Sequence, residues 1–398
     1  MGLLKRIDIT DLFGHYSYNL PFITQHRRNI CFLTGPNGYG KSTILRLIYA
    51  FMKADSRMLL SIPYNSLTFY LKDYTVHLYQ ERIEETSIID ANQVSDDVDE
   101  VCTLTIIVRT ADGGEELERV SFSEKDLEDE SIGSFPPSLS VYLASVDVEY
   151  IPDDRLLPQN ADKSGITDSV GFLQRLLAKY DTHLIECYNR QLLIALRSFS
   201  SEDFTHGELE EQGLLKRAEE KLIAFNKFGL AKQLIDPNIQ ADNHLMFMFQ
   251  MAALDKVLSF DDIIYQRISL LYEIIVSSEF SDKSLVLDPK NGLFFISGDT
   301  IIIPEELSSG EQHFIIQLIT LLMKAENGSL ILIDEPELSY HPAWQLDYLK
   351  NLRKIATLGE YQFILATHSP QIFDYRWGYT IDLFKQTTKD AEGSETLS

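Results

Sequence analysis

The sequence is poor in cysteine and contains no long uncharged hydrophobic run. Its 398 residues include three cysteines, Cys31, Cys102 and Cys187, which are odd in number and far apart. This number and spacing argue against both a disulfide framework and a cysteine zinc site, and they fit a reducing cytoplasm best. Because no apolar run is long enough to cross a bilayer, we expect no membrane association. The start MGLLKRIDITDLFG is too charged for a secretory signal peptide, so the expected location is cytoplasmic.

Positive charge is also scarce. The chain has 35 Lys and Arg against 60 Asp and Glu, which gives a net charge of −25. Such a chain repels nucleic-acid phosphates over most of its surface, so DNA binding would need a local basic groove. The few basic runs are Lys5-Arg6, Arg27-Arg28 and Arg353-Lys354.

Apolar residues make up 44% of the chain, enough for a sizeable core. Both ends of the chain mix strand and helix patterns, whereas residues from about 168 to 278 are almost all helical in pattern. Residues 3–10 alternate as an edge strand would. Further strands are expected at 29–34, within 65–80 as a hairpin, and at 104–108, 141–145, 285–287, 293–296, 300–303, 330–333 and 362–367. Helices are expected at 41–53, 169–199, 214–225 and, as a pair, between 242 and 277.

The stretch GPNGYGKST follows a buried strand and opens a helical pattern. It matches G-x-x-x-x-G-K-[ST] in the context that this phosphate-binding motif requires. The glycines let backbone N–H groups point at phosphate oxygens, and the helix start adds its positive end. Lys41 would contact the β and γ phosphates of ATP, and Ser42 would ligate Mg²⁺. The expected nucleotide-binding residues are Gly35, Pro36, Asn37, Gly38, Tyr39, Gly40, Lys41, Ser42 and Thr43.

Two later stretches place polar side chains directly after buried strands. In SLILIDEPE, Asp334 and Glu335 follow four apolar residues, at the strand end where open α/β sheets bind ligands. Asp334 would hold Mg²⁺, mostly through its water, and Glu335 would polarise the water that attacks the γ-phosphate. In FILATHSP, His368 would hydrogen-bond the γ-phosphate or that water. A lone histidine after a strand is usually structural, but its position one helix beyond the acid pair favours the catalytic role.

LSSGEQ, residues 307–312 and called the signature segment below, begins another helical pattern. Ser308, Ser309 and Gly310 would present free N–H groups to an anion. Because the phosphate-binding loop already occupies one side of the nucleotide, this second helix start would reach the γ-phosphate from another copy of the chain. We therefore expect a head-to-tail homodimer, or a higher homo-oligomer, that encloses two ATP molecules.

Together, GPNGYGKST, LSSGEQ, LILIDEPE, the loop LSYHPAWQ and ATHSP resemble the ABC-type ATPases of the RecF/SMC/OLD-like branch, which are AAA family ATPases. The resemblance covers roughly residues 1–80 and 285–385. It implies an α/β P-loop head, Mg²⁺-dependent ATP hydrolysis, an ATP-dependent dimer, the signature role of Ser308 and Gly310, and a dimer-face loop at 337–341. The expected parts are 1–160 and 283–388 for the head, 161–282 for an inserted helical lobe, and 389–398 for a tail.

The sequence departs from the family pattern at two points. The glutamine that senses Mg²⁺ has two candidates, Gln80 and Gln159, and the sequence does not choose between them. Arg155, in VEYIPDDRLLPQ, is a candidate for facing the nucleotide. OLD-like enzymes carry an acidic nuclease domain after the head, and this chain ends soon after Leu383.

This layout is similar to the stand-alone ATPase subunits of bacterial anti-phage systems of the PARIS and Septu types. That similarity implies an ATP-driven sensor or scaffold that controls a separate effector nuclease. The alternative is a RecF- or SMC-like DNA-repair clamp, which the charge of −25 disfavours. A transporter ATPase subunit fits less well, because the inserted lobe is long and no coupling partner is evident.

Overall fold

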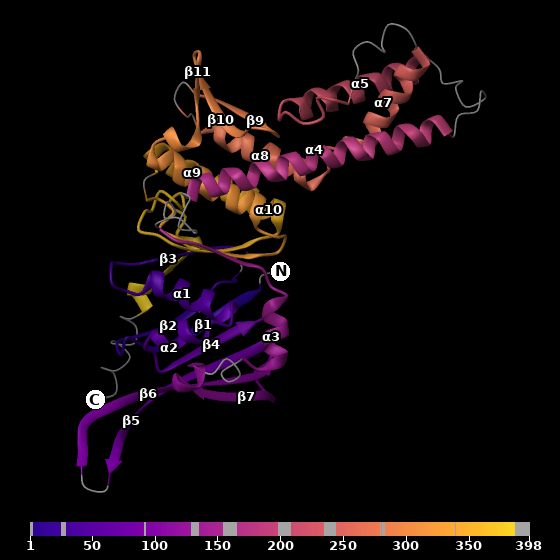
Figure 1. Ribbon diagram of the computed structural model, residues 1–398. Coiled ribbons are helices and arrows are strands. Elements are labelled where there is room, and N and C mark those ends of the chain that lie inside the picture. The colour runs from indigo at the N-terminus through magenta and orange to yellow at the C-terminus, as the bar shows by residue number, and fades with distance from the viewer. Residues whose placement is uncertain are drawn as a thin grey trace. The chain divides into compact units, whose positions relative to one another are not determined.

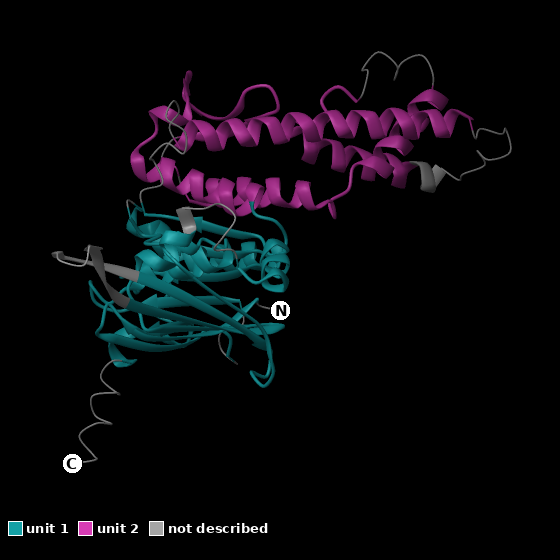
Figure 2. Ribbon diagram, turned by 60° about the horizontal axis from the view of Figure 1, so that its bottom comes forward, with its two compact units in different colours: residues 1–153, 325–398 teal, residues 154–324 magenta. Residues whose placement is uncertain are grey.

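The computed structural model describes residues 3–24, 29–90, 93–128, 135–153, 165–197, 208–234, 244–278, 280, 283–338 and 340–386. The chain forms two compact units, shown in different colours in Figure 2. Unit 1 comprises residues 1–153 and 325–398, and unit 2 comprises residues 154–324. Within the described residues, no helix has the length and apolar character needed to span a bilayer.

A parallel five-stranded sheet forms one layer of unit 1, in the order β14-β3-β13-β12-β8. Its three central strands are buried along their whole length, as expected for strands covered on both faces. The predicted strands at 29–34, 330–333 and 362–367 are thereby confirmed. The strands are β3 (Ile30–Thr34), β8 (Val148–Ile151), β12 (Leu330–Asp334), β13 (Gln362–Ala366) and β14 (Thr380–Asp382).

A second, antiparallel sheet has the order β2-β1-β4-β5-β6-β7. The predicted hairpin is confirmed, since Tyr70 pairs with Thr75 across a tight turn. The prediction of an edge strand at 3–10 was wrong: β1 pairs with β4 on one side and with β2 on the other. The strands are β1 (Leu4–Leu12), β2 (Tyr16–Pro21), β4 (Ser66–Leu71), β5 (Tyr74–Asp90), β6 (Gln93–Thr110) and β7 (Glu116–Ser123).

Helix α1 (Lys41–Met52) lies between the two sheets of unit 1 (Figure 1). Its apolar residues join both sheets in one core, in which Phe51 stacks on Phe69 of β4 at 3.8 Å between ring centroids. Helix α10 (Pro342–Gly359) connects β12 to β13. Unit 1 also contains α2 (Ser56–Ser61), α3 (Pro137–Ala144) and the short 3-10 turns Lys125–Glu128 and Trp377–Tyr379.

The prediction of a strand at 141–145 was wrong, because these residues belong mainly to helix α3. Pro137 occupies the first turn, where a proline ring fits and no N–H is needed. Leu139 and Leu143, four residues apart, are buried, whereas Val141 between them is 74% exposed. A short apolar run is too short to show whether its apolar residues repeat as in a helix or as in a strand. The strand that pairs with β12 at this edge of the parallel sheet is β8.

Unit 2 holds the helices α4 (Gly165–Arg197), α5 (Glu208–Asn226), α7 (His244–Val257) and α8 (Ile263–Ser277), which confirms the helical pattern of the middle region. It also contains the antiparallel sheet β11-β10-β9 and helix α9. Helix α4 packs against α7, α9 and β10, and this explains why the signature segment clusters with the helical lobe. The remaining bounds are β9 (Ser284–Asp288), β10 (Gly292–Ser297), β11 (Thr300–Ile302), a 3-10 turn (Pro304–Glu306), α9 (Ser309–Ile319) and a π turn (Thr320–Lys324).

Candidate nucleotide-binding site

The phosphate-binding loop joins β3 to α1 in unit 1. Gly38 and Gly40 have φ angles of +87° and +77°, a region that residues with a Cβ rarely adopt. A Cβ on Gly40 would also lie 3.1 Å from Cδ2 of Leu12. The Tyr18 hydroxyl donates to the carbonyl of Tyr39 at 2.9 Å and ties the loop to β2. The loop is therefore curled and fixed against the antiparallel sheet.

Lys41, the first residue of α1, folds back over this loop. Its Nζ donates to the carbonyl oxygens of Gly35 and Pro36, each at 3.1 Å. Burial lowers the pKa of Lys41, and the nearby charges of Glu335 and Asp334 oppose that shift. The ammonium thus lies between the loop and the acidic end of β12, where a triphosphate would find a positive charge.

Ser42 and Asp334 form the oxygen-rich part of the site. Ser42 Oγ donates to Oδ1 of Asp334 at 3.0 Å, and the Tyr150 hydroxyl donates to Oδ2 at 3.3 Å. Burial raises the pKa of Asp334, while the hydrogen bond from Ser42 lowers it. A hydroxyl and a carboxylate at this spacing supply the hard oxygen ligands that Mg²⁺ prefers, so these two residues fit the predicted metal role.

Glu335 and His368 meet at the carboxyl ends of the neighbouring strands β12 and β13. Glu335 Oε1 lies 3.5 Å from Nε2 of His368. The Glu335 backbone has a φ of +40°, which is unusual for a residue with a side chain, and its N–H donates to the carbonyl of Ala366 at 3.0 Å. Burial, reinforced by the charge of Glu337, raises the pKa of the Glu335 carboxyl. The two predicted catalytic residues therefore come together in the folded chain.

Glu337 holds the loop that carries His368, a role that the sequence reasoning missed. Its Oε1 accepts hydrogen bonds from Thr367 Oγ1 at 2.7 Å, His368 N at 2.7 Å and Ser369 N at 3.1 Å. The sequence does show Glu337 as a third acid, two residues after the Asp334-Glu335 pair, and this was the signal from which its role could have been sought. Its meaning depends on β13 lying beside β12, which the sequence alone does not specify.

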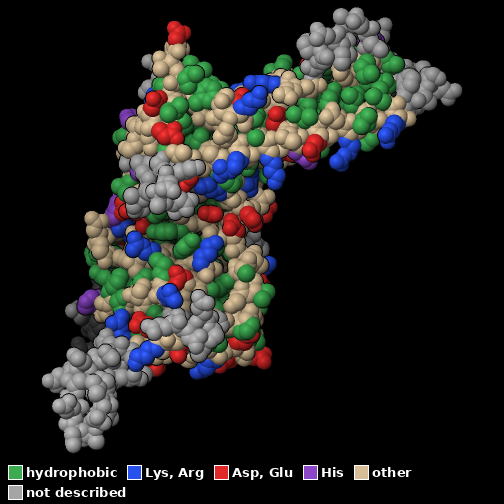
Figure 3. Space-filling model, viewed as in Figure 1, with side chains coloured by type: hydrophobic (Ala, Val, Ile, Leu, Met, Phe, Trp, Pro, Cys, Tyr) green, Lys and Arg blue, Asp and Glu red, His purple; other side chains and the backbone are tan. Residues whose placement is uncertain are grey.

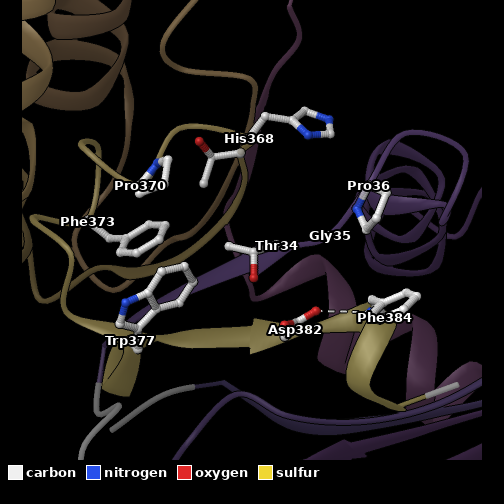
Figure 4. A pocket seen from close by; sticks show the side chains of 10 residues that line it. Thr34, Gly35, Pro36, His368, Pro370, Phe373, Trp377, Asp382 and Phe384 are labelled. Carbon is white, nitrogen blue, oxygen red and sulfur yellow. Dashed lines mark hydrogen bonds between the residues drawn. The ribbon is translucent and has the colours of Figure 1, made fainter. Parts of the chain in front are cut away.

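A pocket of about 270 Å³ opens beside the start of the phosphate-binding loop. Figure 4 shows Phe373 and Trp377 across this pocket from Pro36. The pocket is lined by Thr34, Gly35, Pro36, Thr367, His368, Pro370, Phe373, Trp377, Asp382 and Phe384. The loop and the histidine thus share one concave surface of unit 1.

Of the two candidate magnesium-sensing glutamines, Gln80 has a structural role. Its Oε1 accepts from Tyr64 N at 3.1 Å, and its Nε2 donates to the carbonyls of Leu59 at 2.9 Å, Leu60 at 3.1 Å and Ile62 at 3.0 Å. Both polar atoms of the buried amide are thereby engaged with the end of α2 and with the residues that follow it. Gln159 and Arg155 lie outside the described residues.

The signature segment lies in unit 2, where Ser308 caps α9. Ser308 Oγ accepts from the N–H of Glu311 at 3.4 Å, and the Glu311 carboxylate accepts from Ser308 N at 2.9 Å and Ser308 Oγ at 2.7 Å. Ser308 and Ser309 are exposed, and Gly310 is a buried residue of α9. The first turn of α9 is therefore well formed, and its serines face solvent within the unit.

Three solved structures to which the chain is similar are SMC head domains. The head of Pyrococcus furiosus Smc with an extended coiled coil, bound to the C-terminal domain of ScpA, has 15% identity over 94% of this chain and 91% of that chain, with a TM-score of 0.41. An SmcHead bound to the C-winged helix domain of ScpA has 13% identity over 94% and 91%, with a TM-score of 0.39. The SMC head domain of Thermotoga maritima has 13% identity over 94% and 92%, with a TM-score of 0.36.

No curated protein matches the chain. A family model does match, and it spans residues 112–374, more than half of the chain. The matched region includes the signature segment, the Asp334-Glu335 pair and His368. The fold of the chain is an α/β P-loop head of the ABC type with an inserted helical region. The chain belongs to the family described as "AAA domain, putative AbiEii toxin, Type IV TA system".

Proposed function

We propose that this protein binds ATP with Mg²⁺ and hydrolyses it to ADP and phosphate between two copies of the chain. The observation that carries the proposal is the convergence of two pairs, Ser42 with Asp334 and Glu335 with His368, at one end of the parallel sheet. One pair suits a metal ion and the other suits a water molecule. Both pairs belong to the same unit as the phosphate-binding loop.

Each residue then has a defined task. The N–H groups of the loop and Lys41 bind the β and γ phosphates. Mg²⁺, held by Ser42 and Asp334, would supply neutralisation of the phosphate charge. Glu335 accepts the proton of the attacking water, and its raised pKa brings it closer to the pH at which a general base works best. His368 donates a hydrogen bond to the γ-phosphate, while Glu337 fixes the position of its backbone.

The signature segment would complete the site from a second copy. Ser309 and Gly310 stand in the first turn of α9, where backbone N–H groups have no acceptor within the helix. Such a helix start favours an anion, and the exposed serines leave it accessible within unit 2. ATP would therefore join the copies, and hydrolysis would separate them.

The cellular role that we propose is a sensor or scaffold of an anti-phage complex, in which the ATP-joined dimer restrains or releases an effector nuclease. Its support is the sequence resemblance to stand-alone defence ATPases. The alternative is a DNA clamp, which would bind through local basic runs because the net charge of −25 disfavours binding over the whole surface. Of the basic runs, Arg6 is paired with Asp8 at 2.8 Å, Arg353 is engaged with the Tyr379 hydroxyl, and Arg27-Arg28 lies outside the described residues. On the face drawn in Figure 3, acidic and basic side chains are interspersed.

The decisive experiment combines two variants. Glu335→Gln should bind ATP, lose hydrolysis and accumulate as a dimer in sedimentation with Mg²⁺ and ATP. Ser308→Arg in that background should bind ATP equally well but remain a monomer. Normal hydrolysis by Glu335→Gln would refute the assignment of the base, and a dimer that forms regardless of Ser308→Arg would refute the shared site.

A separate measurement tests the alternative. Fluorescence anisotropy with duplex DNA, at low salt with and without ATP, should give no binding. Tight, salt-dependent binding that appears only with ATP would instead favour the clamp.

A further inference from the structure

Lys283 lies just before β9 and contacts the signature segment. Its Nζ is 2.5 Å from Oε1 of Glu311, and the other oxygen of that carboxylate holds Ser308. The Lys283 side chain is 22% exposed and the Glu311 side chain 9%. The three residues therefore form a continuous chain of interactions from the sheet of unit 2 to the first turn of α9.

This arrangement has an electrostatic consequence. Glu311 completes the cap of α9, but it also places a carboxylate at the helix start that the proposed function assigns to a γ-phosphate. Burial raises the pKa of Glu311, yet hydrogen bonds from Lys283 and Ser308 outweigh it and hold the pKa below its ordinary value. Glu311 is thus a fixed negative charge, and like charges repel strongly where water is excluded. Unless another group neutralised it, that charge would oppose the anion.

We propose that Lys283 is a positioning residue of the signature segment, which neutralises Glu311 and fixes it on Ser308 so that α9 can receive the γ-phosphate of ATP held by a second copy. The inference rests on the proposed function. The hydrogen bonds between Ser308 and Glu311 set the geometry of the helix start. Lys283 restores the positive potential at the N-terminus of α9, which the carboxylate of Glu311 would otherwise cancel. Because Lys283 adjoins β9, which pairs with β10, its anchor is part of the sheet of unit 2.

The test uses variants in the Glu335→Gln background and measures dimer formation by sedimentation with Mg²⁺ and ATP. Lys283→Met should weaken the dimer at least about tenfold, an effect of the size that close charge pairs at interfaces produce. Lys283→Arg, which keeps the charge, should dimerise like the parent. The double variant Lys283→Met with Glu311→Gln leaves no uncompensated carboxylate and should return to the level of Glu311→Gln alone.

Added salt provides a second readout, because screening should reduce the defect of Lys283→Met and leave the double variant unaffected. Circular dichroism and the thermal unfolding profile verify the fold of each variant, because Lys283 and Glu311 belong to unit 2, and ATP binding by the monomer verifies that unit 1 is unaffected. The inference is overturned if Lys283→Met dimerises like the parent, or if the double variant is as weak as Lys283→Met. If Lys283→Met does not fold, the comparison of the double variant with Glu311→Gln alone still tests the inference, because the two should dimerise equally well. If the Glu335→Gln parent does not dimerise with ATP, the proposed function itself fails and this inference with it.

Discussion

Replacement of Glu337 tests whether the hydrogen bonds to the His368 loop matter for hydrolysis. One carboxylate oxygen accepts three hydrogen bonds, from Thr367 Oγ1, His368 N and Ser369 N. Hydrogen bonds to charged groups contribute about 1.5–3 kcal/mol each, and three bonds on one oxygen are not additive. Glu337→Ala should therefore cost about 3–4 kcal/mol in holding the loop, whereas Glu337→Gln keeps an acceptor oxygen and should cost about 1 kcal/mol.

These costs convert into rates. The reaction requires the His368 loop to be in place, and a cost of about 1.4 kcal/mol corresponds to a tenfold loss of rate. We therefore expect kcat to fall at least roughly a hundredfold in Glu337→Ala and less than about tenfold in Glu337→Gln. ATP affinity should fall much less than kcat, because the phosphate-binding loop and Lys41 still bind the phosphates and only the hydrogen bond from His368 is lost. The assay is phosphate release at saturating ATP and Mg²⁺, together with the dissociation constant of a labelled ATP analogue.

A matched control is Glu81→Ala, which removes an exposed acid from β5 of the same unit and should leave kcat unchanged. The reasoning is refuted if Glu337→Ala turns over within about threefold of the wild type. It is equally refuted if alanine and glutamine variants are impaired to the same extent, since the acceptor oxygen would then have no importance.

Three further predictions concern single positions. Gln80→Leu should lower the free energy of unfolding by about 2–4 kcal/mol in urea denaturation, because a buried N–H and three carbonyls lose their hydrogen-bond partner. The Mg²⁺ dependence of hydrolysis should not change. Unchanged stability together with an altered Mg²⁺ dependence would instead identify Gln80 as the metal sensor. Gly40→Ala should weaken ATP binding about tenfold in titration calorimetry, because the φ of +77° and the contact with Leu12 distort the loop, and wild-type affinity would contradict this. The pKa of Glu311 is below its ordinary value of 4.5 in the folded chain, so its stabilising contribution is present above that pH and is lost as the pH falls through the folded pKa. The stability difference between wild type and Glu311→Gln should accordingly shrink in acid denaturation, and a constant difference would argue against the ion pair.

The sequence alone determined the local parts of the site. A strand, a glycine turn and a helix start are contiguous in the chain, so Gly35–Thr43 could be recognised before any contact was known. The same holds for Asp334 and Glu335 at the end of β12 and for His368 after β13, since the carboxyl ends of parallel strands meet at one edge of a sheet. Long helices such as α4 were also predictable, because their period repeats over many residues.

Only the tertiary structure decided which of these parts touch. Ser42 reaches Asp334 across 292 residues of sequence, and Glu337 reaches the His368 loop because β12 and β13 are neighbours in register. Gln80 became a structural residue through hydrogen bonds to a segment that no motif marks, and Lys283 is joined to the signature segment by an ion pair with Glu311. Hydrogen bonds and ion pairs act over a few ångströms, so the packing of distant segments, rather than any local pattern, assigns their partners.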